Sequence, residues 1–216
     1  LPGFVDGDVS VQDEAAQMAA LWLGAEPGQR VLDACAAPGG KACHILEEQP
    51  GLAELVAMDL DPQRLQRVEA HLARLGLQAG LVAGDGADPP TSLASASFER
   101  ILVDAPCSAS GVIRRNPDVK LLRRAADIGG FAATQLAILR GLWPLLKPGG
   151  RLLYATCSVL AQENDDVVNR FVGETPTAGT LALPTAAGEE AGPGRQLLPT
   201  PDGPDGLFYA LLEKHT

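Results

Sequence analysis

Two cysteines stand at the ends of apolar runs, and each lies in a short motif that also carries a serine. Cys107 follows Asp104 in the run Asp-Ala-Pro-Cys-Ser, and Cys157 stands in the run Thr-Cys-Ser. A thiolate is a nucleophile, and a group beside it can act as its base. Two such thiols predict covalent chemistry on a substrate that needs both a nucleophile and a base. The thiols of Cys35 and Cys43 lack this setting, and we interpret them as small buried hydrophobic groups.

A third motif, Ala36 to Lys41, ends the first apolar run and predicts a cofactor site. Its small residues let the backbone approach a ligand, and the helix that follows favours an anionic group at its N-terminus. Asp59 and Asp85 end the next two apolar runs, where carboxylates suit ribose hydroxyls and an adenine amino group. Asp59 alone also fits a helix cap, and Asp85 alone also fits a turn. Because such residues end three successive strands, together they favour a bound ligand. The predicted site comprises Cys35, Ala36, Ala37, Pro38, Gly39, Gly40, Lys41, Asp59, Asp85 and Asp104.

The pattern of glycines and lysines limits the kind of cofactor. The chain has no GxGxxG run at this turn and no P-loop lysine pattern, which argues against a dinucleotide or a nucleoside triphosphate. An adenosine cofactor without a pyrophosphate fits the three strand ends best. The sequence therefore predicts S-adenosylmethionine.

Elements that alternate between strand and helix must position these motifs. Apolar runs and helical spacing predict helices over 14–23, 41–48, 62–75, 125–146 and 162–172, with a possible kink at Gly129-Gly130. Strands are predicted over 31–34, 54–58, 78–83, 98–103 and 151–155. A last strand over 207–213 forms a hairpin with 196–198, and 175–193 reads as a surface loop. This order predicts one α/β domain, residues 1–216, with a doubly wound, mostly parallel sheet and an antiparallel closing strand. Ligands of such sheets bind at the carboxyl ends of the strands, where the motifs lie.

Composition restricts the setting and the partners. The net charge of −10 argues against a general nucleic-acid binder, because an acidic surface repels phosphate. No apolar run approaches a membrane span, and no signal segment is visible. The four cysteines form neither a disulfide framework nor a zinc pattern, so we expect a reducing, cytoplasmic setting and no metal. We also expect the protein to be a monomer. Because the chain starts at Leu1 without a methionine, we expect it to be part of a longer protein.

Five basic residues gather directly after the Cys107 motif, within residues 114–124. One interpretation is a solvated helix face. The other is a local phosphate-contact patch beside the active site. The members are Arg114, Arg115, Lys120, Arg123 and Arg124.

The motifs together carry a family resemblance that covers nearly the whole chain. The chain resembles the RNA 5-methylcytosine methyltransferases of the Sun/NOL1/NOP2 family, and within it the bacterial enzymes that act on small-subunit ribosomal RNA. It departs from the usual pattern at Asn116, Ala42-Cys43 and Leu207, none of which touches the proposed chemistry. The matching stretches are 11–13, 35–41 with His44, 104–111, 114–118, 154–158, Glu163-Asn164 and 205–210.

The resemblance implies a Rossmann-like class I methyltransferase fold, S-adenosylmethionine as cofactor and a chemical role for each cysteine. Cys157 would attack carbon 6 of cytosine, and Cys107 would assist release of the methylated product. DNA cytosine methyltransferases instead attack with a Pro-Cys cysteine, which here would be Cys107. Asp104 would bind the N3/N4 edge of the base, and Lys41 would position the cofactor end of the site or the substrate. RNA contacts are predicted at Lys41, Arg114, Arg115 and Lys120.

Two other functions stay open at this stage. The target could be transfer RNA instead of 16S ribosomal RNA, because the catalytic motifs do not separate them. The chain could also be an assembly factor of the ribosome that binds the cofactor without turnover. Family members carry an N-terminal RNA-binding domain that this chain lacks, so we expect its own RNA affinity to be weak.

Overall fold

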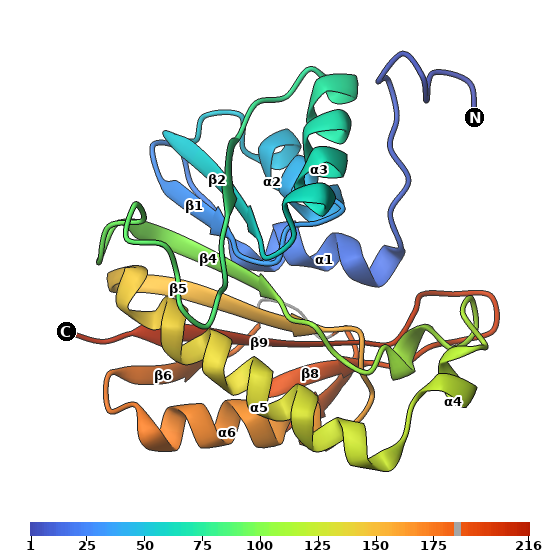
Figure 1. Ribbon diagram of the computed structural model, residues 1–216, viewed down its shortest axis with the longest axis vertical. Helices are drawn as coiled ribbons and strands as arrows, with labels where there is room; N and C mark the ends of the chain where they lie inside the picture. The colour runs from blue at the N-terminus through green and yellow to red at the C-terminus, as the bar shows by residue number, and fades with distance from the viewer. Residues whose placement is uncertain (184–186) are drawn as a thin grey trace.

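The computed structural model describes residues 1–183 and 187–216, and within them one mixed sheet of nine strands lies between two layers of helices (Figure 1). The strand order is β3-β2-β1-β4-β5-β9-β8-β7, and β6 also pairs with β9. The first five strands run parallel to one another, and the rest join antiparallel. The strands are β1 (Arg30–Asp33), β2 (Glu54–Asp59), β3 (Gly80–Ala83), β4 (Phe98–Asp104), β5 (Leu146–Thr156), β6 (Ala178–Leu181), β7 (Glu189–Ala191), β8 (Gly194–Leu197) and β9 (Leu207–Lys214). The predicted doubly wound sheet with an antiparallel closing strand is confirmed.

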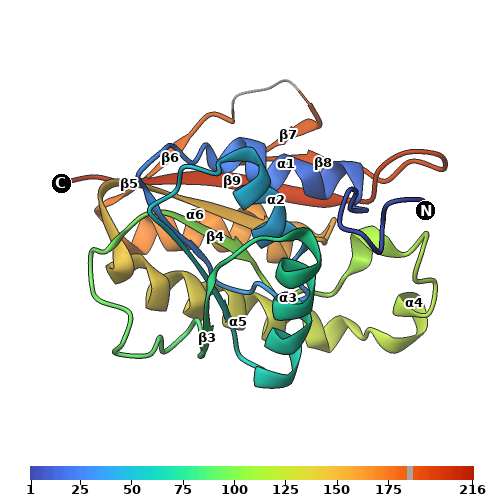
Figure 2. The ribbon, with the colours of Figure 1, turned by 90° about the horizontal axis from the view of Figure 1, so that it is seen from above.

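The helices cover both faces of the sheet and divide the core into two layers (Figure 2). Successive strand residues point to opposite faces. Val31 accordingly packs in the layer under α1, α2 and α3, whereas Leu32 packs in the layer under α5 and α6. The helices are α1 (Glu14–Leu23), α2 (Gly40–Glu48), α3 (Pro62–Leu75), the short α4 (Val119–Leu122), α5 (Ala125–Leu142) and α6 (Asp165–Glu174).

The helix ends of the first half follow from local chemistry. The Asp61 carboxylate accepts a hydrogen bond from the Gln63 N–H at 2.8 Å, and Pro62 occupies the first turn, where no amide donor is needed. Gly76 then ends α3 at φ +67°, a left-handed conformation that glycine adopts without strain. Asp13 caps α1 in the same way, since its carboxylate accepts a hydrogen bond from the Ala15 N–H at 3.0 Å.

The prediction of a loop over 175–193 is wrong in part. β6 pairs with β9, and β7 forms a hairpin with β8. Neither strand shows the apolar alternation that would predict it from the sequence. Backbone hydrogen bonds to a neighbouring strand hold each one in place instead. Residues 184–186 of the predicted loop lie outside the described residues. The hairpin of β8 with β9 is confirmed.

Two predicted helices also differ in extent. α5 ends at Leu142, and Trp143–Leu145 form a 3₁₀ turn that contains Pro144 before β5 begins. Gly129 and Gly130 do not break α5, which runs unbroken from Ala125. The predicted helix over 162–172 begins as a 3₁₀ turn, Ala161–Glu163, and α6 starts only at Asp165. Glu163 and Asn164 are buried there instead of standing on an exposed first turn.

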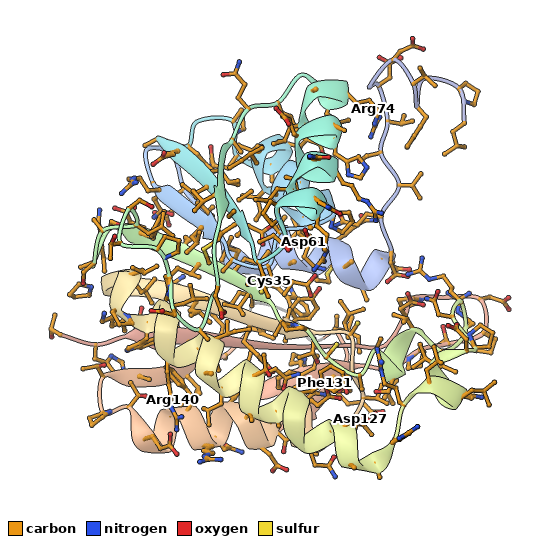
Figure 3. The ribbon with its side chains drawn as sticks, in the orientation of Figure 1. Cys35, Asp61, Arg74, Asp127, Phe131 and Arg140 are labelled. Atoms are coloured by element: carbon orange, nitrogen blue, oxygen red, sulfur yellow. The ribbon has the colours of Figure 1, made fainter. Side chains whose placement is uncertain are left out.

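The N-terminal segment is held against α3 by one arginine (Figure 3). The Arg74 guanidinium donates hydrogen bonds to the carbonyl oxygens of Phe4, at 2.6 Å, and Val9, at 3.0 Å. Its guanidinium carbon also lies 4.2 Å from the centre of the Phe4 ring. Across the described residues, no helix combines the length and the apolar character that crossing a bilayer requires.

Candidate active site

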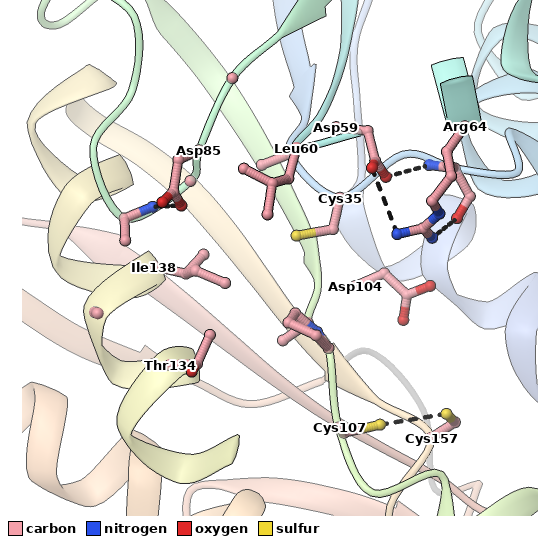
Figure 4. A pocket seen from close by; sticks show the side chains of 18 residues that line it. Cys35, Asp59, Leu60, Arg64, Asp85, Asp104, Cys107, Thr134, Ile138 and Cys157 are labelled. Atoms are coloured by element: carbon pink, nitrogen blue, oxygen red, sulfur yellow. Dashed lines mark hydrogen bonds and ion pairs between the residues drawn. The ribbon is translucent and has the colours of Figure 1, made fainter. Parts of the chain in front are cut away.

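The main pocket, with a volume of about 520 Å³, opens at the carboxyl ends of β1, β2, β3, β4 and β5 (Figure 4). Each strand contributes a residue at or just beyond its end, which is where an open parallel sheet binds its ligand. α5 closes one side with Thr134, Ala137 and Ile138. The strand-end residues that the sequence singled out and the pocket brings together are Cys35, Ala37, Asp59, Asp85, Asp104, Cys107 and Cys157.

Asp59 is fixed at one end of this pocket. Its side chain is 3% exposed, and its Oδ2 accepts a hydrogen bond from the Ala37 N–H at 3.1 Å. Its Oδ1 accepts from the Asp61 N–H and lies 3.4 Å from the Arg64 guanidinium. The carboxylate thus joins the turn after β1 to the start of α3. Asp85 stands after β3 and accepts a hydrogen bond from the Ala87 N–H at 2.8 Å.

Two apolar side chains of the main pocket were not found by sequence reasoning. Leu60 follows Asp59 and is 69% exposed, and Ile138 faces it from α5 across the pocket (Figure 4). The exposed leucine beside a strand-end carboxylate was a signal that could have been used. Ile138 carried no local signal, because it is one of many apolar residues on a largely apolar helix.

A second pocket of about 240 Å³ adjoins the first and shares Cys35, Ala37 and Asp104 with it. The predicted cofactor residues Ala36, Pro38, Gly40 and Lys41 line this second pocket and not the main one. Gly39 lines neither. At φ +108° it passes α3 so closely that a Cβ would lie 3.0 Å from the Val68 Cα, so Gly39 is needed for packing.

The second pocket contains a charged group of three residues. Lys41 Nζ lies 2.6 Å from Asp104 Oδ2, and only 15% of the lysine side chain is exposed. Burial disfavours the charged lysine, but Asp104 outweighs it and the pKa of Lys41 is raised. Asp33 is 1% exposed, and neither of its carboxylate oxygens has a hydrogen-bond partner among the described residues. Burial, with Asp104 adding repulsion, raises the pKa of Asp33 to about 7.

The two motif thiols face each other at the deep end of the main pocket. Cys107 Sγ and Cys157 Sγ are 3.3 Å apart (Figure 4). The hydrogen bond with Cys107 lowers the pKa of Cys157, with a smaller lowering by Lys41, against the opposing effects of burial and of Asp104. The same hydrogen bond, together with burial, raises the pKa of Cys107. Cys157 is therefore the thiol that ionises first, and Cys107 stays protonated beside it.

The other two cysteines differ from this pair. Cys43 is 3% exposed in the core under α2, and burial raises the pKa of its thiol to about 11. Burial also raises the pKa of the Cys35 thiol, which lines both pockets. Both thiols are protonated at neutral pH, as expected for small apolar groups. Within residues 1–183 and 187–216, no three His, Cys, Asp or Glu side chains are grouped so as to hold a metal ion.

The basic residues after Cys107 have three kinds of surroundings. Arg123 donates a hydrogen bond to the Ser108 carbonyl at 2.9 Å and lies over the Phe131 ring. The guanidinium groups of Arg114 and Arg115 both pair with Asp205, a carboxylate that is completely buried, and Arg115 also lies 3.7 Å from Asp13. Lys120 and Arg124 are exposed and form no ion pair with any carboxylate of the described residues. The basic residues are exposed but do not share one helix face, because α4 has only four residues and two of the arginines bind the C-terminal loop.

Solved structures with the same fold identify the class. The chain aligns over 99% of its length with 49% of PH0851, with a TM-score of 0.94 and 32% identity. It aligns over its full length with 56% of NSun6 from Pyrococcus horikoshii, a structure with SFG, an analogue of S-adenosylmethionine (TM-score 0.88, 27% identity). The fold and the pocket at its carboxyl edge are those of a Rossmann-like methyltransferase.

The family follows from the sequence. Residues 20–213 match the family described as 16S rRNA methyltransferase RsmB/F. Ribosomal RNA small subunit methyltransferase B of Pseudomonas putida is 55% identical over 214 residues, which are 99% of this chain and 49% of that protein. The chain belongs to the RsmB/F family. It spans about half the length of the curated relatives that it matches.

Proposed function

We propose that this chain is the catalytic domain of an enzyme that transfers a methyl group from S-adenosylmethionine to carbon 5 of a cytosine in 16S ribosomal RNA. The observation that carries the proposal is the pair of thiols 3.3 Å apart in the main pocket, one with a lowered and one with a raised pKa. The relative from Pseudomonas putida is named for small-subunit ribosomal RNA, which favours this RNA over transfer RNA.

The main pocket fits S-adenosylmethionine. Its volume lies within the range of small-molecule sites, and a few polar side chains stand in a largely apolar lining. Asp59 would accept hydrogen bonds from the ribose hydroxyls, and Asp85 would accept one from the adenine amino group. Leu60 and Ile138 would pack against the two faces of the adenine ring. When bound, the cofactor supplies an electrophilic methyl group near the thiol pair.

The cysteine pair explains how an unreactive carbon becomes a nucleophile. Carbon 5 of cytosine attacks a methyl group only after a thiolate has added to carbon 6. Cys157 suits this step, because the hydrogen bond with Cys107 lowers its pKa by more than burial and Asp104 raise it. Asp104, held by Lys41, would bind the N3/N4 edge of the base while charge develops on the ring.

Product release reverses the addition. After methylation, water that enters the open pocket takes the proton from carbon 5. The electron pair of that C–H bond restores the double bond between carbons 5 and 6, and Cys157 Sγ leaves carbon 6 as a thiolate. A thiol with a lower pKa leaves faster. Cys107 therefore assists this step by keeping its proton and donating a hydrogen bond to the departing sulfur. The target base must be unpaired or flipped out of its stack to reach these groups.

The RNA strand would approach from the side of the second pocket and the segment after Cys107. Lys120 is free of carboxylate partners within the described residues and suits a phosphate contact. Arg114 and Arg115 keep part of their side chains exposed, 37% and 53%, although both pair with Asp205. Lys41 would contact the target nucleotide from inside. We place the monomeric enzyme in the cytoplasm, where bacterial ribosomal RNA is made.

The test is methyl transfer to defined RNA. The protein is incubated at low salt with S-adenosylmethionine labelled in its methyl group and with unmodified 16S ribosomal RNA or transfer RNA, and the RNA is digested to nucleosides. Label in 5-methylcytidine from 16S RNA supports the proposal. Label from transfer RNA alone, or bound cofactor without any transfer, would replace it with one of the two other functions.

The exposed leucine beside Asp59 gives a prediction about cofactor binding. Leu60→Ala is expected to weaken S-adenosylmethionine binding about tenfold, because the ligand no longer covers a full leucine side chain. Isothermal titration calorimetry measures the change. Leu121→Ala is the matched control, since Leu121 is 87% exposed but lies outside the main pocket, and its affinity should equal that of the wild type. Equal affinities for both variants would place the adenine elsewhere.

A further inference from the structure

A buried carboxylate joins the two cysteine loops and is used by none of the steps above. Glu163 lies in the 3₁₀ turn before α6 and is 0% exposed. Its Oε1 accepts a hydrogen bond from the Ser108 N–H at 2.7 Å, directly after Cys107. Its Oε2 accepts one from the Ser158 hydroxyl at 2.7 Å, directly after Cys157. One side chain thus holds the residue that follows each thiol.

Further contacts fix the carboxylate itself. Gln135 Nε2 donates to Glu163 Oε1 at 3.2 Å and to the Pro106 carbonyl at 3.0 Å, so the Cys107 loop is held from both sides of that residue. The Tyr154 hydroxyl donates to the Glu163 carbonyl at 2.7 Å. No arginine, lysine or histidine of the described residues forms an ion pair with Glu163. The carboxylate therefore has hydrogen-bond donors as its partners, and donors in a buried place orient it strictly.

The geometry of the thiol pair depends on this arrangement. The two thiols reach 3.3 Å only if the loops after β4 and β5 keep their relative positions. Other hydrogen bonds also link the loops: the Gly111 N–H donates to the Cys157 carbonyl at 2.9 Å, and the Val159 N–H donates to the Ser110 hydroxyl at 3.0 Å. The Ser158 hydroxyl also lies 3.1 Å from the Ser110 hydroxyl and 3.4 Å from the Ser108 hydroxyl. Among these partners, Glu163 is the charged group, and its two oxygens bond the residues that directly follow both thiols at 2.7 Å each. We propose that Glu163 is a positioning residue that sets the distance between Cys107 and Cys157. Its consequence for catalysis rests on the proposed function.

Two variants separate the carboxylate's geometry from its bulk. Glu163→Ala removes both acceptors and leaves the Ser108 N–H and the Ser158 hydroxyl without their partner. Glu163→Gln keeps an oxygen for the Ser108 N–H and places an amide group beside the Ser158 hydroxyl, which can then accept. Thr177→Val is a matched control, because it removes a different side-chain hydrogen bond, from the Trp143 indole at 3.0 Å, far from the thiols.

The first readout needs no RNA. Dibromobimane becomes strongly fluorescent when its two bromomethyl groups have alkylated two neighbouring thiols, and each alkylation releases bromide and a proton. Double labelling is measured in the wild type and the three variants, with Cys107→Ala as the background, and thermal unfolding is recorded for each protein. We expect Glu163→Ala to react about tenfold more slowly and Glu163→Gln and Thr177→Val to stay within about threefold of the wild type.

The labelling results test the positioning role of Glu163 separately from the proposed methyl transfer to RNA. A wild-type rate in Glu163→Ala, an equal loss in Glu163→Gln or Thr177→Val, or no double labelling of the wild type would each overturn it. Methyl transfer is then measured, and kcat is expected to fall in Glu163→Ala with KM for RNA unchanged. If the labelling pattern holds but the wild type transfers no methyl group to RNA, the proposed function is wrong while the positioning role stands.

Discussion

Cys157→Ala is expected to abolish methyl transfer to RNA, with a loss of at least about 1000-fold in rate, because it removes the thiolate that forms the bond to carbon 6. Cys107→Ala is expected to retain the addition step and to lose product release. The protein should then stay bonded to the RNA through Cys157 Sγ. Denaturing gels of each protein, incubated with S-adenosylmethionine and excess 16S ribosomal RNA at low salt, measure this adduct.

The two variants give opposite results if the roles are assigned correctly. An adduct that accumulates in Cys107→Ala and is absent in Cys157→Ala supports the assignment from the pKa directions of the two thiols. The reverse pattern would make Cys107 the nucleophile, as in DNA cytosine methyltransferases. Cys43→Ala is the control, because that thiol lies in the core and its loss should leave the adduct pattern unchanged.

The strand ends of this site were predictable from the sequence. Each predicted parallel strand of the first half ends within a few residues of a carboxylate, glycine or cysteine, and parallel strands end at the same edge of the sheet. Asp59, Asp85, Asp104 and the two motif cysteines therefore had to meet if the fold was right, and they do. What local sequence could not supply was the division of the Ala36 to Lys41 turn between two pockets.

Residues that act through tertiary contacts were missed for a physical reason. Glu163 fits the rule that acidic side chains favour the first turn of a helix, and that rule places it on the surface. Its burial depends on donors from Ser108, Gln135 and Ser158, which are separated from it by up to 55 residues in the chain. The partner of Arg114 and Arg115 is also far away in the sequence, since Asp205 follows Arg115 by 90 residues. The local sequence therefore did not show that these arginines pair with a carboxylate.

Asp33→Asn is expected to make the protein more stable than the wild type, by a larger margin at pH 8 than at pH 5. The pKa of Asp33 is about 7 in the folded protein against an ordinary 3.8, so the folded state holds this proton more tightly than the unfolded state. Between these two pKa values the folded protein binds more protons than the unfolded protein does, so the stability of the wild type falls as the pH rises. Asparagine has no charge to bury and escapes this loss.

The size and the pH window of the effect follow from the same shift. The stability gained by Asp33→Asn should grow from about pH 4 to pH 7 and stay constant above, reaching about 4 kcal/mol, of which more than half is gained between pH 5 and pH 7. Urea unfolding of the wild type and the variant at pH 5, 6, 7 and 8 gives the difference directly. Thr177→Val is the control, because its stability difference from the wild type should not vary with pH.

A constant difference between Asp33→Asn and the wild type across this range would show that Asp33 is ionised at pH 5 and finds a partner for its charge. Lys41 is the cation that favours the charged form of Asp33, and its ammonium group already lies 2.6 Å from Asp104. One lysine would then neutralise two buried carboxylates. If the stability difference between Asp33→Asn and the wild type rises with pH as expected, Asp33 takes up a proton because Lys41 is paired with Asp104. Lys41 and Asp104 are then the charged pair beside the Cys157 thiolate.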